Sequence, residues 1–194
     1  MRSVFVNLGP LVSFRNASEH SIENTVELAG LGIVVEEGVI KTIKHSHELI
    51  DEYSIPEGRH SKIGETACFD LEGHAVVPGL IDGHTHLLWA GDRSKEVSWR
   101  REGKSYAEIA SLGGGIQYTV QQTREANDEA LHLLGYQRLR EALRTGTTHL
   151  EAKSGYGLNV DSELRLLEVA ERLNNNAHTP TIDHTWMGAH DIPR

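Results

Sequence analysis

Strand-like and helix-like segments alternate through the C-terminal part of the sequence, from residue 75 onward. Three apolar, β-rich runs are separated by segments with helical periodicity. In chain order the strand-like runs are Ala75–Ile81, Thr147–Ala152 and Thr179–Met187, and the main helical segments between them are Asn127–Arg144 and Asp161–Asn174. Strands joined through helices are parallel and their connections right-handed, so this order predicts parallel α/β winding. The first run is apolar at nearly every position, which predicts a strand buried on both faces.

Capping residues predict where the helices of this part begin and end. Ser105 lies three residues before Glu108, the spacing of a capping box, and Asn127 is a favourable N-cap for a longer helix. Gly146 follows that helix and is expected to end it. Asp161 is expected to cap the next helix.

The sequence before residue 75 has a shorter, strand-like pattern. The β-rich runs Ile33–Val35 and Val39–Ile43 flank a short turn that ends in Gly38, which predicts a β-hairpin. Polar stretches at Asn16–Thr25 and His45–Thr66 are expected to be loops.

The two patterns predict two domains, a small β domain at residues 1–74 and a β/α domain at residues 75–194. A closed barrel of eight strand–helix units needs about 250 residues, whereas the second domain supplies only about three strands. The fold class is therefore α/β, and the second domain is either an open sheet or the front portion of a longer barrel.

Composition argues against several classes of partner. The sequence has 28 acidic and 19 basic side chains, a net charge of 19 − 28 = −9, and no run of Lys or Arg. We therefore expect no nucleic acid and no anionic membrane surface as partner. No segment reaches the roughly 18 apolar residues of a membrane span, and the start does not have the pattern of a signal peptide. With Cys68 as the single cysteine, a reducing, cytoplasmic location is expected.

The segment Asp82–His86, which contains a His-x-His motif, directly follows the first apolar run. Residues i and i+2 of a β-strand point to the same side, so the imidazoles of His84 and His86 are expected to converge, whereas on a helix they would diverge by about 200°. Neutral imidazoles are ordinary zinc ligands, and the carboxyl ends of parallel barrel strands carry active sites. These two histidines are the candidate metal ligands, one short of the three protein ligands that catalytic zinc sites use.

Three other residues follow strands at the same expected end of the sheet. His190 comes just after the third run and is expected to contact substrate. Arg93 offers a guanidinium that suits a carboxylate, or it is a solvated loop cation. Tyr156 lies between two glycines, which predicts a tight turn that presents its phenol or packs it on the core. Gly113–Gly115 matches no nucleotide fingerprint and is expected to be a loop that is flexible or closely approached.

Longer motifs add a family resemblance. Pro78–His86 resembles the first-strand motif of the amidohydrolase superfamily, with Gly83 in place of the proline often found there, and the hairpin at 33–40 looks like its small β-sandwich. Four further segments resemble, more narrowly, the imidazolonepropionase family: HTHLLWAGDR, SLGGGIQYTVQQTREA, GTTHLEAKSGYGL with the following SELRLLEVAERL, and TWMGAHDIP.

This resemblance implies both a fold and a reaction. The fold would be an incomplete TIM-type (β/α) barrel, about three of eight strands, preceded by a small β-sandwich-like domain. The reaction would be metal-dependent hydrolysis of 4-imidazolone-5-propanoate to N-formimidoyl-L-glutamate in histidine degradation. By similarity, His84 and His86 would hold one divalent or trivalent metal ion, zinc or iron. Arg93 would bind the propanoate of this small anionic substrate, and Tyr156 and His190 would contact it, His190 as the candidate catalytic residue.

Other interpretations stay open at this stage. Members of the family are about twice this length, so the remaining metal ligands and the general base are expected outside these residues, and the isolated chain is expected to be inactive. The alternatives are another amidohydrolase acting on a cyclic amide or amidine, or a non-catalytic fragment. If the chain nevertheless held a metal tightly, His184, His190 and Glu151 would be the first further ligands to test. A homodimer is compatible with the complete enzyme, although the sequence does not determine the oligomeric state.

Overall fold

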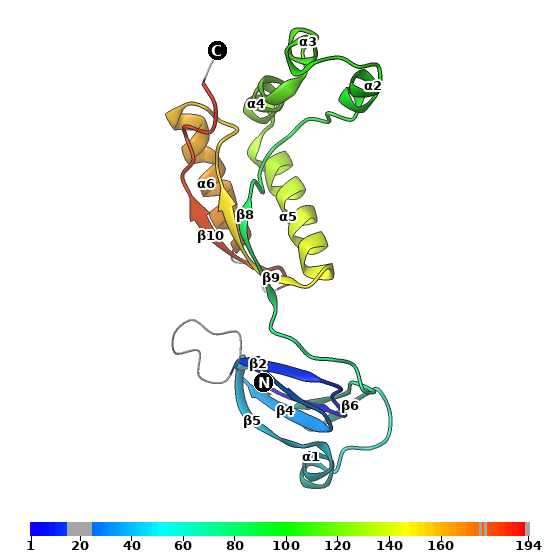
Figure 1. The fold of residues 1–194 in the computed structure, drawn as a ribbon. Coiled ribbons are helices and arrows are strands. Elements are labelled where there is room, and N and C mark those ends of the chain that lie inside the picture. The colour runs from blue at the N-terminus through cyan, green and yellow to red at the C-terminus, as the bar shows by residue number, and fades with distance from the viewer. Residues whose placement is uncertain (15–24, 175, 177, 193–194) are drawn as a thin grey trace. The chain divides into compact units, whose positions relative to one another are not determined.

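The computed structural model describes residues 1–14, 25–174, 176 and 178–192. The chain is a mixed α/β protein with two compact units, Met1–Pro78 and Gly79–Arg194. Each unit is described by itself below, and the elements of both are labelled in Figure 1. The loop predicted at Asn16–Thr25 lies outside the described residues, except for Thr25 itself.

The N-terminal unit is built mainly of β-strands. One sheet has the strand order β5-β4-β1-β7-β6, and β2 pairs with β3 in a separate antiparallel pair. The strands are β1 (Arg2–Val6), β2 (Leu11–Phe14), β3 (Thr25–Leu28), β4 (Leu31–Glu36), β5 (Val39–His45), β6 (His60–Ile63) and β7 (Thr66–Asp70). The predicted hairpin is confirmed as β4 and β5. Its turn residues Glu37 and Gly38 both have positive φ, 52° and 78°, as a type I′ turn requires.

The polar stretch from His45 to Thr66 is not a continuous loop, so that prediction was wrong. It contains helix α1 (Ser46–Tyr53) and strand β6. Leu49 is fully buried in the core cluster of this unit, and Ile50 packs partly buried against the same cluster. A few apolar side chains on one helical face are enough to fasten a short helix to a sheet, although the segment is polar on average.

The C-terminal unit has a three-stranded parallel sheet in the order β10-β9-β8. Its elements are β8 (Leu80–Thr85), α2 (Lys95–Arg101), α3 (Tyr106–Ser111), α4 (Gly115–Glu125), α5 (Asp128–Arg144), β9 (Thr147–Lys153), α6 (Val160–Asn174) and β10 (Thr181–Thr185). Helix α5 packs on β9, α6 packs on β10, and the two helices contact each other (Figure 1). The fully buried side chains of Leu131, Leu139, Leu150 and Leu166 lie in the core between these helices and the sheet.

Two of the three predicted caps are confirmed. Ser105 and Glu108 form the capping box of α3, and the Asn127 side chain accepts the Ala130 N–H at the start of α5. The cap predicted for α6 was wrong by two residues. The helix begins at Val160, and the side chain of Asn159, in place of that of Asp161, accepts the Ser162 N–H. Asn and Asp cap helices equally well, so the sequence offered two equivalent candidates.

The apolar run at residues 75–81 is not a strand buried on both faces. Strand β8 begins only at Leu80, and Val77, Leu80 and Ile81 are 58%, 56% and 71% exposed. β8 is the edge of the described three-strand sheet, so within the described residues no further strand covers these side chains. In a separate observation, no helix in the described part of the chain combines the length and apolar character needed to cross a membrane.

Candidate metal and substrate site

The carboxyl ends of the three parallel strands bring three predicted site residues together. His86 follows β8 directly, Tyr156 follows β9 in the turn after Lys153, and His190 lies in the segment after β10. The backbone N–H of Ser154 donates to the carbonyl of Thr185 at 3.0 Å, which extends the pairing of β9 and β10 beyond the sheet. Parallel pairing places all three strand ends at one edge, so the side chains that follow them share one region.

Four aromatic rings form a connected cluster at this edge. The ring centroids of His86 and His190 are 4.3 Å apart and stacked at 12°. Tyr156 lies 5.2 Å from His86 and 5.3 Å from His190. His84 lies 5.6 Å from His86 with an edge-on ring. The structure therefore brings together four of the five residues that the sequence singled out, and we call His84, His86, Tyr156 and His190 the ring cluster.

His86 is the residue of this cluster best suited to hold a cation. Its Nδ1 is buried and has no hydrogen-bond partner among the described residues. Burial is the largest cause that lowers the pKa of His86 below its ordinary value, and the neighbouring His190 and His84 lower it further, while a hydrogen bond with the Ser154 backbone acts in the opposite direction. The imidazole is therefore neutral at pH 7, which is the form that binds metals.

The two histidines of the motif converge on an irregular strand. The pairing register of β8 with β9 shifts between Asp82 and Thr85, which is not the even alternation assumed from the sequence. The Asp82 carboxylate accepts the backbone N–H of His84 and the hydroxyl of Thr85, each at 3.0 Å. The aspartate thus holds the backbone of the motif at the place where the register shifts.

The backbone around His190 restricts its tautomer. His190 Nδ1 lies 3.0 Å from the carbonyl oxygen of Gly155. A carbonyl only accepts, so in the neutral ring the proton lies on Nδ1 and the lone pair on Nε2. Gly155 has φ of 131°, and a Cβ there would lie 2.8 Å from His190 Nδ1, so glycine permits this close approach.

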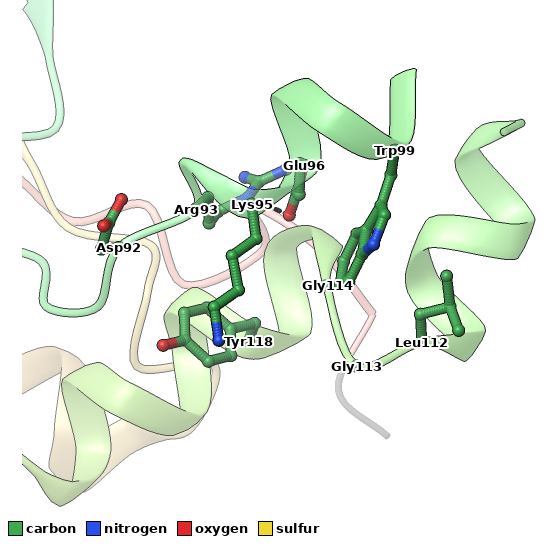
Figure 2. Close-up of a pocket in the computed structure, with 9 residues that line it drawn as sticks. All are labelled: Asp92, Arg93, Lys95, Glu96, Trp99, Leu112, Gly113, Gly114 and Tyr118. Atoms are coloured by element: carbon green, nitrogen blue, oxygen red, sulfur yellow. Dashed lines mark hydrogen bonds and ion pairs between the residues drawn. The ribbon is translucent and has the colours of Figure 1, made fainter. Parts of the chain in front are cut away.

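Arg93 is not a free loop cation. Its Nε donates to Glu96 Oε1 at 2.7 Å and its Nη2 to Glu96 Oε2 at 2.8 Å (Figure 2). The Glu96 hydrogen bond is the main cause that raises the pKa of Arg93, and the Tyr156 phenol of the ring cluster adds to it. Figure 2 shows the pair in a pocket that Trp99, Gly114 and Tyr118 help to line.

Sequence reasoning missed two buried carboxylates that organise this region. Glu96 accepts from Arg93 and from the Gly115 N–H, and Glu163 is fully buried. Glu163 accepts three backbone N–H groups from the turn that carries Tyr156: those of Gly155, Gly157 and Leu158, at 2.6, 2.8 and 2.7 Å. The only signal was their position in the first turn of a helix, where many exposed acidic residues also occur.

Arg138 on α5 binds the chain segment Leu87–Trp89, which follows His86. Its guanidinium lies 3.8 Å over the ring of Trp89 and donates to the carbonyls of Leu87 and Trp89 at 2.8 and 2.9 Å. Burial lowers the pKa of Arg138 to about 10. The arginine remains a cation at pH 7 and anchors this segment to α5.

Other candidate ligands are engaged elsewhere. The Glu151 carboxylate accepts from Lys153 and from Thr185. His184 Nδ1 lies 3.5 Å from the Glu171 carboxylate, whereas its Nε2 is buried and has no hydrogen-bond partner among the described residues. Across the described residues, no group of three or more His, Cys, Asp or Glu side chains is arranged to hold a metal ion.

Three of the curated proteins that are similar to this chain all carry the name imidazolonepropionase, one of them as a probable one. No family model matches the chain. It is 38% identical over 200 residues to imidazolonepropionase of Geobacillus kaustophilus, covering 100% of this chain and 45% of that protein. It is 44% identical over 161 residues to imidazolonepropionase of Paracoccus denitrificans, covering 83% and 38%, and 38% identical over 177 residues to probable imidazolonepropionase of Mus musculus, covering 90% and 39%.

Comparison with solved structures gives the fold. Atrazine chlorohydrolase of Arthrobacter aurescens TC1, as a mutant complexed with zinc and atraton, matches with a TM-score of 0.54 and 16% identity. The match covers 94% of this chain and 35% of that one. Guanine deaminase of E. coli matches with a TM-score of 0.50 and 14% identity, covering 90% and 34%.

The curated relatives decide the assignment, because the structural matches show the fold alone. The chain spans less than half the length of the curated relatives it matches. Over the part that it does span, this chain belongs to the imidazolonepropionase family.

Proposed function

We propose that the complete protein hydrolyses 4-imidazolone-5-propanoate to N-formimidoyl-L-glutamate in the cytoplasm. The imidazolonepropionase relatives support this reaction. The observation that carries the proposal is the ring cluster, in which two histidines of the motif, Tyr156 and His190 gather at the carboxyl edge of the sheet. A homodimer of the complete protein is part of the same proposal.

The fold behind this function is an incomplete TIM-type (β/α) barrel. We take β8, β9 and β10 as about three of its eight strands and residues 1–74 as a small β-sandwich-like domain. The exposed apolar side chains of Leu80 and Ile81 support this interpretation, because further strands of a barrel would cover them.

The site suits one metal ion, zinc or iron, held in part by His84 and His86. The unpartnered, buried Nδ1 of His86 is the observation that supports a cation there. A bound metal ion would lower the pKa of its water toward about 7 and so supply a hydroxide at neutral pH. Further ligands must come from residues outside the described three-strand sheet, because catalytic sites use three protein ligands.

The chain's own side chains would bind and orient the substrate. Arg93 would hold the propanoate, and the Tyr156 hydroxyl would donate to the oxygen that becomes negative as water adds to the ring carbonyl. His190 Nε2, with its lone pair free, is placed to take up a proton and return it to the ring nitrogen as the C–N bond breaks. Water is consumed, one C–N bond breaks and one C–O bond forms.

The test is turnover by the complete protein. Purified protein loaded with zinc or with iron should convert 4-imidazolone-5-propanoate to N-formimidoyl-L-glutamate, followed by mass spectrometry. Guanine and a cyclic amide without a carboxylate serve as competing substrates. Turnover of either one in place of the imidazolone would favour another amidohydrolase activity.

A second candidate applies to the 194-residue chain by itself. The absence of a three-donor group among the described residues supports a chain that does not turn over and binds metal weakly. Metal analysis after gel filtration tests this directly, and one tightly held ion per chain would contradict it.

A further inference from the structure

We propose that Glu96 is a positioning residue for the substrate clamp. It holds one edge of the Arg93 guanidinium and leaves the terminal edge free for the substrate carboxylate. This inference rests on the proposed function, and it assigns a role to a residue that does not touch the substrate.

The hydrogen-bond pattern of Arg93 carries the first step. A guanidinium presents a side edge, made of Nε–H and one Nη2–H, and a terminal edge, made of Nη1–H and the other Nη2–H. Glu96 takes the side edge with both oxygens, at 2.7 and 2.8 Å. Among the described residues, Nη1 of Arg93 has no hydrogen-bond partner, so the terminal edge remains available for a second bidentate contact.

Glu96 is itself fixed by the glycine loop. Its Oε1 accepts the Gly115 N–H at 2.7 Å at the start of α4, where a negative charge is favoured by the helix dipole. A Cβ on Gly114 would lie 3.0 Å from Glu96 Oε1 and 2.8 Å from Ile109 Cγ2. The loop Gly113–Gly115, which matched no nucleotide motif, therefore lets a carboxylate reach a backbone donor.

The charges around Glu96 leave a net positive site. The Glu96 side chain is only 6% exposed, and Arg100 approaches its Oε2 at 3.6 Å in addition to Arg93. Two guanidinium groups thus share the Glu96 carboxylate, and Lys95 and Asp92 line the same pocket (Figure 2). Three cations therefore stand against two carboxylates, an excess of one positive charge. An isolated Arg93–Glu96 ion pair would have no net charge and would attract an anionic substrate less.

The experiment compares an anion with its neutral analogue. The probes are 3-(imidazol-4-yl)propanoate and the corresponding propanamide, titrated into the complete protein by calorimetry. The variants are Glu96→Gln, Arg93→Gln, the double variant, and Glu102→Gln as a matched control. Glu102 is exposed, pairs with Lys104 and lies just after α2.

We expect Glu96→Gln to weaken propanoate binding about tenfold, which corresponds to about 1.4 kcal/mol, and to leave propanamide binding unchanged. Arg93→Gln should weaken propanoate binding at least as much. The double variant should bind the propanoate no more weakly than Arg93→Gln, because Glu96 and Arg93 act through the same contact with the substrate. In turnover, Glu96→Gln should raise KM and leave kcat nearly unchanged. Glu96→Asp keeps the charge but withdraws the carboxylate by one methylene group, so it should also lose preference for the anion.

Three results would contradict the proposal, and each can be told apart from the others. If Arg93→Gln weakens the propanoate and neither Glu96 variant does, Glu96 only fastens α2 to α4, and the clamp stands without it. Equal weakening of both probes by Glu96→Gln also overturns the positioning role. If Arg93→Gln binds the propanoate as the unmodified protein does, the proposed clamp fails and this inference fails with it.

Discussion

The ring of His190 stacks on the ring of His86 with centroids 4.3 Å apart and planes within 12°. One ring follows the first strand of the parallel sheet and the other follows the third. Two imidazolium ions in such a stack would repel each other, so at least one ring is neutral. The contact joins a candidate metal ligand to the candidate catalytic residue.

Replacing His190 tests its role in proton transfer. In the complete protein, His190→Ala should lower kcat about a hundredfold or more, the usual contribution of a general acid or base. Folding should be preserved, because the described segment after β10 contributes little to the core. His178→Ala is the control, since His178 is exposed on the same part of the chain. Equal kcat values for the two variants would remove His190 from the reaction.

The metal content of histidine variants shows which histidines are metal ligands. In the complete protein, His84→Ala and His86→Ala should each reduce bound zinc or iron from one equivalent to a small fraction, measured by plasma mass spectrometry. His47→Ala, at an exposed position in the N-terminal unit, should keep a full equivalent. Circular dichroism shows whether each variant is folded. A folded His86→Ala protein with full metal would contradict the assignment.

The order of elements and the place of the ring cluster could be predicted from local patterns. The caps at Ser105 and Asn127 depend on residues three positions apart, and both were predicted correctly. The convergence of Tyr156 and His190 on His86 follows from one long-range rule, that parallel strands end at the same edge. The expected roles of these residues stay predictions until they are tested.

The supporting carboxylates could not be predicted, because their partners are backbone groups. Glu96 bonds the N–H of Gly115, and Glu163 bonds three N–H groups of the turn around Tyr156. The amino-acid sequence does not show which backbone N–H groups will lack a backbone acceptor in the fold. The burial of the apolar run at 75–81 was wrong for a different reason: burial depends on neighbouring strands that the described residues do not include.

Removing the Glu163 carboxylate should destabilise the C-terminal unit strongly. Glu163→Ala leaves three buried backbone N–H groups without an acceptor, so we expect a loss of about 3 kcal/mol or more in the free energy of unfolding. Urea denaturation of the 194-residue chain, followed by fluorescence, measures it. Glu168→Ala, exposed on the same helix, should change stability by less than about 0.5 kcal/mol. Similar losses for the two variants would mean that the turn does not depend on Glu163.

The Glu96 ion pair should make stability depend on pH in the acidic range. The hydrogen bond from Arg93 is the main cause that holds the pKa of Glu96 below its ordinary value, and the Gly115 N–H contributes in the same direction. A carboxyl group with a lower pKa in the folded state stabilises the fold above its unfolded pKa of about 4.3. This stabilisation is lost as the pH falls through the folded pKa.

Glu96→Gln cannot titrate, so its difference from the unmodified chain reports this contribution. Near pH 7 the variant should be less stable by about 2 kcal/mol, the usual worth of hydrogen bonds to a charged group. The difference should shrink progressively as the pH is lowered below about 4.3, because the unfolded unmodified chain then binds a proton that the folded chain resists. Urea unfolding at pH 7, 5, 4 and 3 measures the difference, with Glu102→Gln as the control. A difference that stays constant from pH 7 to pH 3 would show that Glu96 stabilises the fold by shape and not by its charge.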